Sequence, residues 1–156
     1  ADLRARLALE EAQRHYEKWM ASSAEFQAGA RFYIRRESAN LAAFSLHQAS
    51  EHLYHCVLLV TTLYSGKAHN LAFLRKKAEG IDTRLADAWP RETKFERRCF
   101  ELLREAYVKA RYSEHFKITA EELAWLAERV DVLRGLTATI CTERLEDLRR
   151  QAEAEG

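Results

Sequence analysis

Residues that interrupt helices and shape tight turns are scarce in this chain. Its 156 residues include five glycines and one proline, too few for the turns of an all-β sandwich or barrel. Five scattered glycines also cannot build the glycine-rich phosphate loops of nucleotide-binding α/β folds. Apolar residues make up 47% of the chain and charged residues 31%, which is typical of a folded domain. The chain is therefore predicted to fold as helices.

Capping residues mark where these helices begin. A serine or threonine followed three positions later by a glutamate is the capping box of a helix start. The pattern occurs at Ser22 with Glu25, Thr93 with Glu96, and Thr119 with Glu122. The predicted helices span about 3–20, 23–36, 41–64, 71–79 and 93–111, with a last helix from 119 and a turn or two at 82–88.

Other residues are expected to end helices or to shape the connections between them. The polar residues 37–40 either break or bend the chain after the second helix. We expect Gly66 to end the third helix in a left-handed conformation, because glycine tolerates this backbone at no steric cost. Asn70 is expected to cap the short helix that follows, and Gly80 to end it.

The last predicted helix has a continuous apolar seam. Its residues step by three and four, the spacing of a bundle interface, and they are Leu123, Leu126, Val130, Leu133, Thr137 and Ile140. Long helices with short connections pack antiparallel to their neighbours. We therefore predict an all-α, antiparallel up-and-down bundle of four to five main helices with short extra helices. It forms one domain over residues 1–156, with a core at about 22–142 and a charged helical tail at 143–156, of which the last ten residues or so are expected to leave the bundle or fray.

The net charge and the cysteine content indicate which binding partners and which cellular compartment suit this chain. The net charge of +1 argues against bulk electrostatic binding of nucleic acid or anionic membranes. No run approaches the ~18 apolar residues of a membrane span, and no signal peptide opens the chain. Cys56, Cys99 and Cys141 form no CxxC pair, which favours buried thiols in the reducing cytoplasm. Because the chain starts at Ala1 and its only methionine is Met20, we expect a piece excised from a longer protein.

Four polar residues share one region of the third predicted helix. His47, Glu51 and His55 lie at steps of four on one face, but they span about 12 Å along the helix and cannot all reach one ion. No metal is therefore predicted. With Gln48 they are expected to line a groove or a dimer contact, since polar groups are costly in a sealed core. The alternative for Gln48 and Glu51 is a satisfied polar pair within the packing.

The connection before residue 71 is a candidate phosphate site. Lys67 and His69 stand beside the N-terminus of the helix that Asn70 caps, where free backbone amides favour an anion. The alternative is a capped turn with solvated lysines.

The stretch 107–117 combines groups that bind nucleotides elsewhere. Arg111 offers a planar fork for phosphate, His115 a group that titrates near neutral pH, and Tyr107 and Tyr112 offer rings on which a base can stack. The alternative is that Tyr112 and Phe116 close the end of the bundle.

Four short motifs occur together in the order and spacing of one family. They are AFSLHQASEHL at 43–53, AHNL at 68–71, ARY at 110–112 and ITAEE at 118–122. Over roughly residues 41–134 the chain resembles the HEPN domain, and most closely those HEPN domains that follow a minimal nucleotidyltransferase domain in bacterial proteins. The resemblance implies an antiparallel helical bundle that is commonly homodimeric and proposed to bind nucleotides, with no required cofactor.

The resemblance also implies an enzymatic alternative. Many HEPN domains are metal-independent ribonucleases with an Arg-x(4–6)-His motif at the dimer interface. Here Arg111 and His115 are separated by three residues, and Tyr112 stands where that motif usually has a small polar residue. Asn70 replaces the aspartate that relatives often carry after the histidine.

We therefore expect a non-catalytic HEPN domain that binds a nucleotide, ATP or GTP, and serves a fused or neighbouring nucleotidyltransferase. The expected nucleotide-binding residues are Lys67, His69, Asn70, Tyr107, Arg111, Tyr112 and His115. The alternatives are a ribonuclease acting on RNA through Arg111 and His115, and a dimerisation module without a ligand.

Overall fold

The computed structural model describes residues 3–67 and 69–154. Along this part of the chain, the elements are α1 (Leu3–Arg35), α2 (Ala39–Thr62), α3 (Leu71–Ile81), the 3-10 helix η1 (Thr83–Ala88), α4 (Lys94–Tyr112) and α5 (Ala120–Ala154). Helical residues make up 85% of the described chain, which contains no strand. The predicted all-α class is confirmed.

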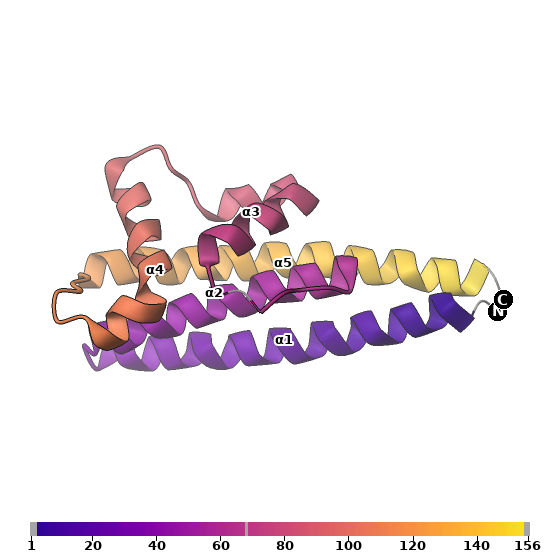
Figure 1. Cartoon of the computed structure of the whole chain (residues 1–156), viewed down its shortest axis with the longest axis horizontal. Helices are drawn as coiled ribbons and strands as arrows, with labels where there is room; N and C mark the ends of the chain where they lie inside the picture. The colour runs from indigo at the N-terminus through magenta and orange to yellow at the C-terminus, as the bar shows by residue number, and fades with distance from the viewer. Residues whose placement is uncertain (1–2, 68, 155–156) are drawn as a thin grey trace.

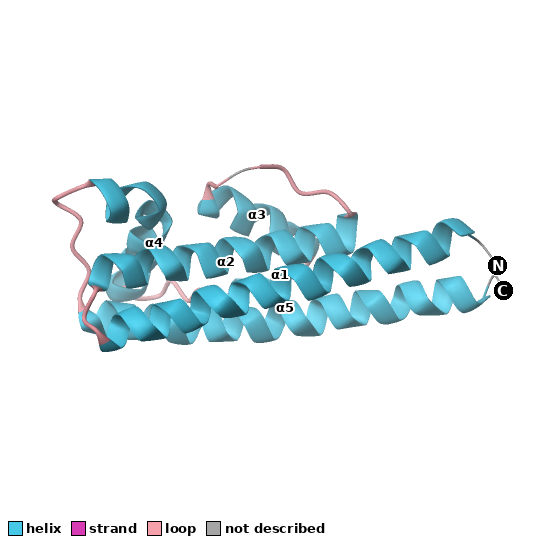
Figure 2. Cartoon of the chain, turned by 90° about the horizontal axis from the view of Figure 1, so that it is seen from below, coloured by secondary structure: helices cyan, strands magenta, loops and turns pink. Residues whose placement is uncertain are grey.

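Three long helices form the body of the bundle. α1, α2 and α5 lie along the long axis, and α1 runs antiparallel to the other two (Figure 1). α3, η1 and α4 lie on one side of this body, with α4 running across the long axis (Figures 1 and 2). The predicted antiparallel arrangement thus holds between α1 and each of the other two long helices, whereas α2 and α5 pack together in parallel and α4 crosses the bundle.

A buried hydrogen bond holds the turn that precedes α4. Trp89 and Tyr54 are both fully buried, and the indole Nε1 of Trp89 donates to the Tyr54 hydroxyl at 2.7 Å. Because a buried indole N–H needs an acceptor, this bond anchors the end of η1 to α2. The chain then passes Pro90 and turns into α4.

α2 is the central helix of the molecule. It packs against α1, α3, α4 and α5, and apolar side chains are therefore buried around most of its circumference. They include Leu46, Leu53, Tyr54, Cys56, Val57, Leu58 and Val60. The same position buries polar side chains of α2, which brings the predicted site residues into the interior.

The helix break predicted at Ser22 is wrong, because α1 continues from Leu3 to Arg35. The Ser22 hydroxyl donates to the Trp19 carbonyl, and the Ser23 hydroxyl donates to the Met20 carbonyl at 2.9 Å. Such bonds to the preceding turn are made by serines inside a helix. Arg134 of α5 also donates to the Ser23 hydroxyl at 2.8 Å, so tertiary contacts stabilise the continuous helix.

The other predicted boundaries have mixed outcomes. Capping boxes at Thr93 and Thr119 are confirmed, each with its glutamate bonded back to the cap amide. The chain breaks after α1 at residues 36–38, where Glu37 adopts a φ of 59°. Gly66 does not end α2, because Leu63 takes the left-handed position with a φ of 58° and its amide donates to the Leu59 carbonyl.

The C-terminal part of α5 stays in the bundle. The expectation that the last ten residues or so leave the bundle or fray is wrong for those that the structure describes, because Leu148 is buried and the helix continues to Ala154; residues 155–156 lie outside the described chain. The start of α1 lies beside the end of α5 (Figure 1), and Ala12 of α1 is fully buried there. Buried side chains therefore extend beyond the expected core at both ends.

Two smaller findings complete the fold. α3 runs one residue past Gly80, to Ile81, so Gly80 does not end it. No helix in the described residues has the length and apolar character needed to cross a membrane.

Candidate functional site

A buried carboxylate on α2 is the centre of a polar cluster. Glu51 is 2% exposed, and its Oε1 accepts from His69 Nδ1 at 2.5 Å while its Oε2 accepts from Gln48 Nε2 at 2.7 Å. His47 Nδ1 and His55 Nε2 lie 3.9 and 3.8 Å from the carboxylate oxygens. We call these five residues the Glu51 cluster. Four of them come from consecutive turns of α2 and the fifth from the α2–α3 connection.

Burial and hydrogen bonding set the charges within the cluster. Burial by itself would raise the pKa of Glu51, but its interactions with His55 and His69 outweigh that effect and hold the pKa below its ordinary value. Burial lowers the pKa of His47 to about 4. Near neutral pH the cluster therefore contains an ionised Glu51 and a neutral His47, whose Nε2 has no hydrogen-bond partner among the described residues.

The ring of Tyr107 joins the cluster to a cation. His69 stacks on this ring with centroids 4.6 Å apart and an interplanar angle of 9°. The Arg111 guanidinium lies 4.6 Å from the same centroid, and its Nε donates to the Tyr107 carbonyl at 2.7 Å. Tyr107 and Arg111 meet because residues four apart share one face of a helix. The rings of Phe44 and Tyr112 also contact the guanidinium, at 4.7 and 4.9 Å.

A cleft of about 390 Å³ opens beside the cluster. Parts of α1, α2 and the α2–α3 connection line it, through Trp19, Gln48, Glu51, His52, His55, Leu59, Ser65, Gly66, Lys67 and His69. His55 Nδ1 and the Ser65 hydroxyl form a hydrogen bond, which ties the connection to α2. The cleft thus combines aromatic rings, polar groups and the lysine side chain of Lys67.

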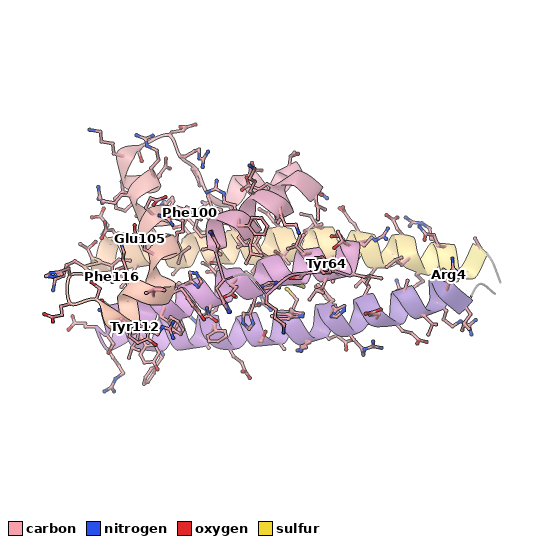
Figure 3. The ribbon with its side chains drawn as sticks, in the orientation of Figure 1. Arg4, Tyr64, Phe100, Glu105, Tyr112 and Phe116 are labelled. Carbon is pink, nitrogen blue, oxygen red and sulfur yellow. The ribbon has the colours of Figure 1, made fainter. Side chains whose placement is uncertain are left out.

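Of the seven predicted nucleotide-binding residues, Lys67 and His69 line the cleft and the other five do not. The Asn70 side chain accepts from the Phe73 amide at 3.1 Å and so caps α3, as expected. His115 is exposed in the connection after α4, where its backbone amide donates to the Ser113 hydroxyl; its side chain forms no hydrogen bond or ion pair with the described residues. Figure 3 shows Tyr112 at the end of α4, and this side chain is 73% exposed.

Sequence reasoning missed the contribution of α1 to the site. Trp19 packs its ring edge-on against His52 at 4.9 Å and lies 5.3 Å from the ring of His55. The Ser22 hydroxyl and His52 Nδ1 are 2.7 Å apart. The spacing of Trp19 and Phe26, seven residues apart, indicates one aromatic face of a helix, but the break assumed at Ser22 separated the two rings.

The part of the chain that the structure describes contains no set of side chains arranged to bind a metal ion. No group of three or more His, Cys, Asp or Glu side chains there is placed to hold a metal ion. The histidines around Glu51 instead interact with its carboxylate. The site therefore consists of hydrogen-bonding, stacking and cationic groups.

The fold and the cluster define an all-α bundle domain with a polar site on its central helix. A comparison with family models matches the HEPN domain over residues 16–137. The chain belongs to the HEPN family, and the matched residues include the whole Glu51 cluster and Arg111. A search of curated proteins found no match to this chain.

Proposed function

We propose that this HEPN domain binds a nucleotide in the cleft beside Glu51 and acts with a fused or neighbouring nucleotidyltransferase. The observation that carries the proposal is the composition of the cleft, in which Lys67 lines the same cavity as Trp19 and the histidines of α2. Its volume of about 390 Å³ is within the range of small-molecule sites. The nucleotidyltransferase role follows from the resemblance to HEPN domains of that arrangement.

Two cationic side chains, Lys67 and Arg111, indicate the edge of the cleft at which the phosphates of the nucleotide bind. Lys67 has no acidic partner among the described residues, and Arg111 contacts rings rather than carboxylates. An unpaired ammonium or guanidinium group binds phosphate through charge-assisted hydrogen bonds. We place the phosphates near Lys67, with Arg111 beyond His69 as a second source of positive charge.

The aromatic side chains indicate that the base of the nucleotide binds on the side of the cleft formed by α1. Tyr107 already stacks on His69 and contacts Arg111, so the expected stacking of a base on this ring is less available. Trp19 lines the cleft directly, and an indole ring provides a stacking surface for any base. We therefore propose that the base lies against Trp19.

Isothermal titration calorimetry with ATP and GTP tests this function. Lys67→Ala is expected to weaken binding by about 1.5–3 kcal/mol, the range for hydrogen bonds to charged groups. Arg111→Ala is expected to weaken it in the same direction. Lys76→Ala is the matched control, because Lys76 is an exposed lysine of α3 that does not line the cleft.

Two results would contradict the proposal. One is the absence of binding of either nucleotide to the folded wild-type protein at millimolar concentration. The other is an equal loss of affinity in Lys67→Ala and Lys76→Ala, which would indicate a diffuse charge effect. His115→Ala separates the binder from a ribonuclease, since a binder keeps nearly all its affinity and a ribonuclease loses RNA cleavage.

A further inference from the structure

His69 has a defined tautomer and a free ring nitrogen. Its Nδ1 lies 2.5 Å from Oε1 of Glu51, and a carboxylate can only accept, so Nδ1 carries the proton. In the neutral imidazole the lone pair is then on the other nitrogen, Nε2. It forms no hydrogen bond or ion pair with the described residues. A buried carboxylate that orients an imidazole in this way is the arrangement that activates a histidine.

The same imidazole is held rigidly and yet reaches the solvent. Stacking on Tyr107 at 4.6 Å and 9° sets the plane of the ring, while the His69 side chain remains 54% exposed. A nucleophile needs both features, because a fixed lone pair must meet a reactant from outside the protein.

The remaining histidines of the described chain lack this combination. His47 and His55 are buried, and His52 is half-buried and bonded to Ser22. His15 lies 3.6 Å from a carboxylate oxygen, beyond hydrogen-bond distance, and His115 has no carboxylate partner. The Glu51–His69 pair is therefore distinct in the part of the chain that the structure describes.

Two cationic side chains, Lys67 and Arg111, lie in the neighbourhood of His69. Lys67 lies two residues before His69 and lines the same cleft, and the Arg111 guanidinium contacts the Tyr107 ring on which His69 stacks. Neither cation has an acidic partner among the described residues. Cations placed near a nucleophile attract a phosphoryl group and stabilise the charge on its oxygens during transfer.

We propose that His69 is a phosphoryl-acceptor residue whose Nε2 forms a covalent phosphohistidine with a small phosphoryl donor. No hydroxyl of the described residues is bonded to Nε2. His69 therefore has no bonded hydroxyl that it could activate as a base, and Nε2 itself attacks the phosphorus atom of the donor. With phosphoramidate as donor, the Nε2–P bond forms as the donor P–N bond breaks. Ammonia leaves with the electron pair of that bond. The imidazole ring gains positive charge, which the Glu51 carboxylate balances through Nδ1–H.

This inference goes beyond nucleotide binding and does not depend on it. Phosphoramidate has no base or sugar, so its reaction tests His69 alone. A failure to bind ATP or GTP would leave the acceptor role standing, and a failure to react with phosphoramidate would leave the nucleotide site standing.

The experiment is incubation of the folded protein with phosphoramidate, followed by ³¹P NMR and intact mass measurement. We expect the gain of one phosphoryl group that is stable in alkali and lost in acid, as a phosphorus–nitrogen bond requires. His69→Ala should abolish this adduct. His115→Ala is the matched control, because it removes an exposed histidine without a carboxylate partner, and it should react like the wild type.

The role of the carboxylate is tested with Glu51→Gln, which keeps the shape of the side chain and removes its charge. We expect the reaction to slow by roughly tenfold or more, the scale on which loss of an orienting carboxylate acts. Circular dichroism checks that the variant is folded, and if it is not, the pair His69→Ala and His115→Ala decides the assignment. The proposal is overturned if no acid-labile adduct forms, if His69→Ala reacts like the wild type, or if folded Glu51→Gln reacts at the wild-type rate.

Discussion

The buried imidazole of His47 shows how one residue in this fold balances opposing effects. It is fully buried on α2, its ring lies 5.4 Å from that of Tyr107, and its Nδ1 faces Glu51 at 3.9 Å. The nearby carboxylate favours protonation, but burial opposes it more strongly, and the pKa falls to about 4. His47 therefore packs as a neutral ring, and its charge is not part of the site.

This pKa predicts how stability depends on pH. The ordinary pKa of histidine is 6.5, so in acid the unfolded chain takes up a proton that the folded protein binds only near pH 4. The free energy of unfolding should therefore fall as the pH decreases from about 6.5 to about 4, with a contribution from His47 of about 3 kcal/mol. Urea unfolding at a series of pH values measures it.

The control is His47→Gln, which has no titrating ring. Its unfolding free energy should depend less steeply on pH over the same interval than that of the wild type. The burial-lowered pKa of His52 acts in the same direction and is present in both proteins. Identical pH profiles for the two proteins would show that His47 does not titrate as inferred.

At the level of single elements, a capping motif forms a helix start only where the chain also leaves the preceding helix. Thr93 follows Pro90 and an irregular turn, and its hydroxyl accepts from the Glu96 amide at 3.1 Å. Ser22 has the same spacing to a glutamate but lies inside α1. There its hydroxyl bonds to the Trp19 carbonyl and contacts His52. The motif is local, but its outcome depends on contacts with α2 and α5.

A pair of substitutions tests this difference. Thr93→Ala removes a true cap and should lower the free energy of unfolding by about 1 kcal/mol. Glu25→Ala removes the glutamate of the unused motif from an exposed position within α1, and should change stability by less than about 0.5 kcal/mol. Chemical denaturation measures both. A cost for Glu25→Ala equal to that for Thr93→Ala would indicate that a helix begins at Ser22 in solution.

At the level of the whole molecule, one face of α4 leaves apolar side chains uncovered. Val108 and Tyr112 are four residues apart and therefore share a face of the helix, and they are 56% and 73% exposed. This face adjoins Arg111, whose guanidinium contacts the Tyr112 ring. We propose that a second copy of the chain covers it, in keeping with the homodimer that the family resemblance implies.

Analytical ultracentrifugation measures this association. The wild type is expected to sediment as a dimer at micromolar concentration, and Tyr112→Asp should weaken the dimer by at least about tenfold, since it places a charge in the buried contact. Phe73→Asp is the control, because Phe73 is half-exposed on α3 rather than on this face of α4. A wild type that remains monomeric at high micromolar concentration would contradict the proposal.

The sequence by itself determined the all-α class, the true caps at Asn70, Thr93 and Thr119, and the cluster of polar residues on one face of α2. These features depend on interactions within a few residues, namely helical spacing, side-chain bonds to nearby amides and the scarcity of glycine and proline. The site residues of α2 were found in the same way, because steps of four place His47, Glu51 and His55 on one face.

Only the tertiary structure decided the continuity of α1, the packing of the end of α5, and the partners of Glu51. Each depends on contacts between residues far apart in the chain: Arg134 with Ser23 across α1 and α5, and His69 with Glu51 across the α2–α3 connection. Local spacing carries no information about which distant side chain will meet a given carboxylate. The stacking of His69 on Tyr107, which leaves Nε2 of His69 exposed, therefore depends on the packing of α4 against α2.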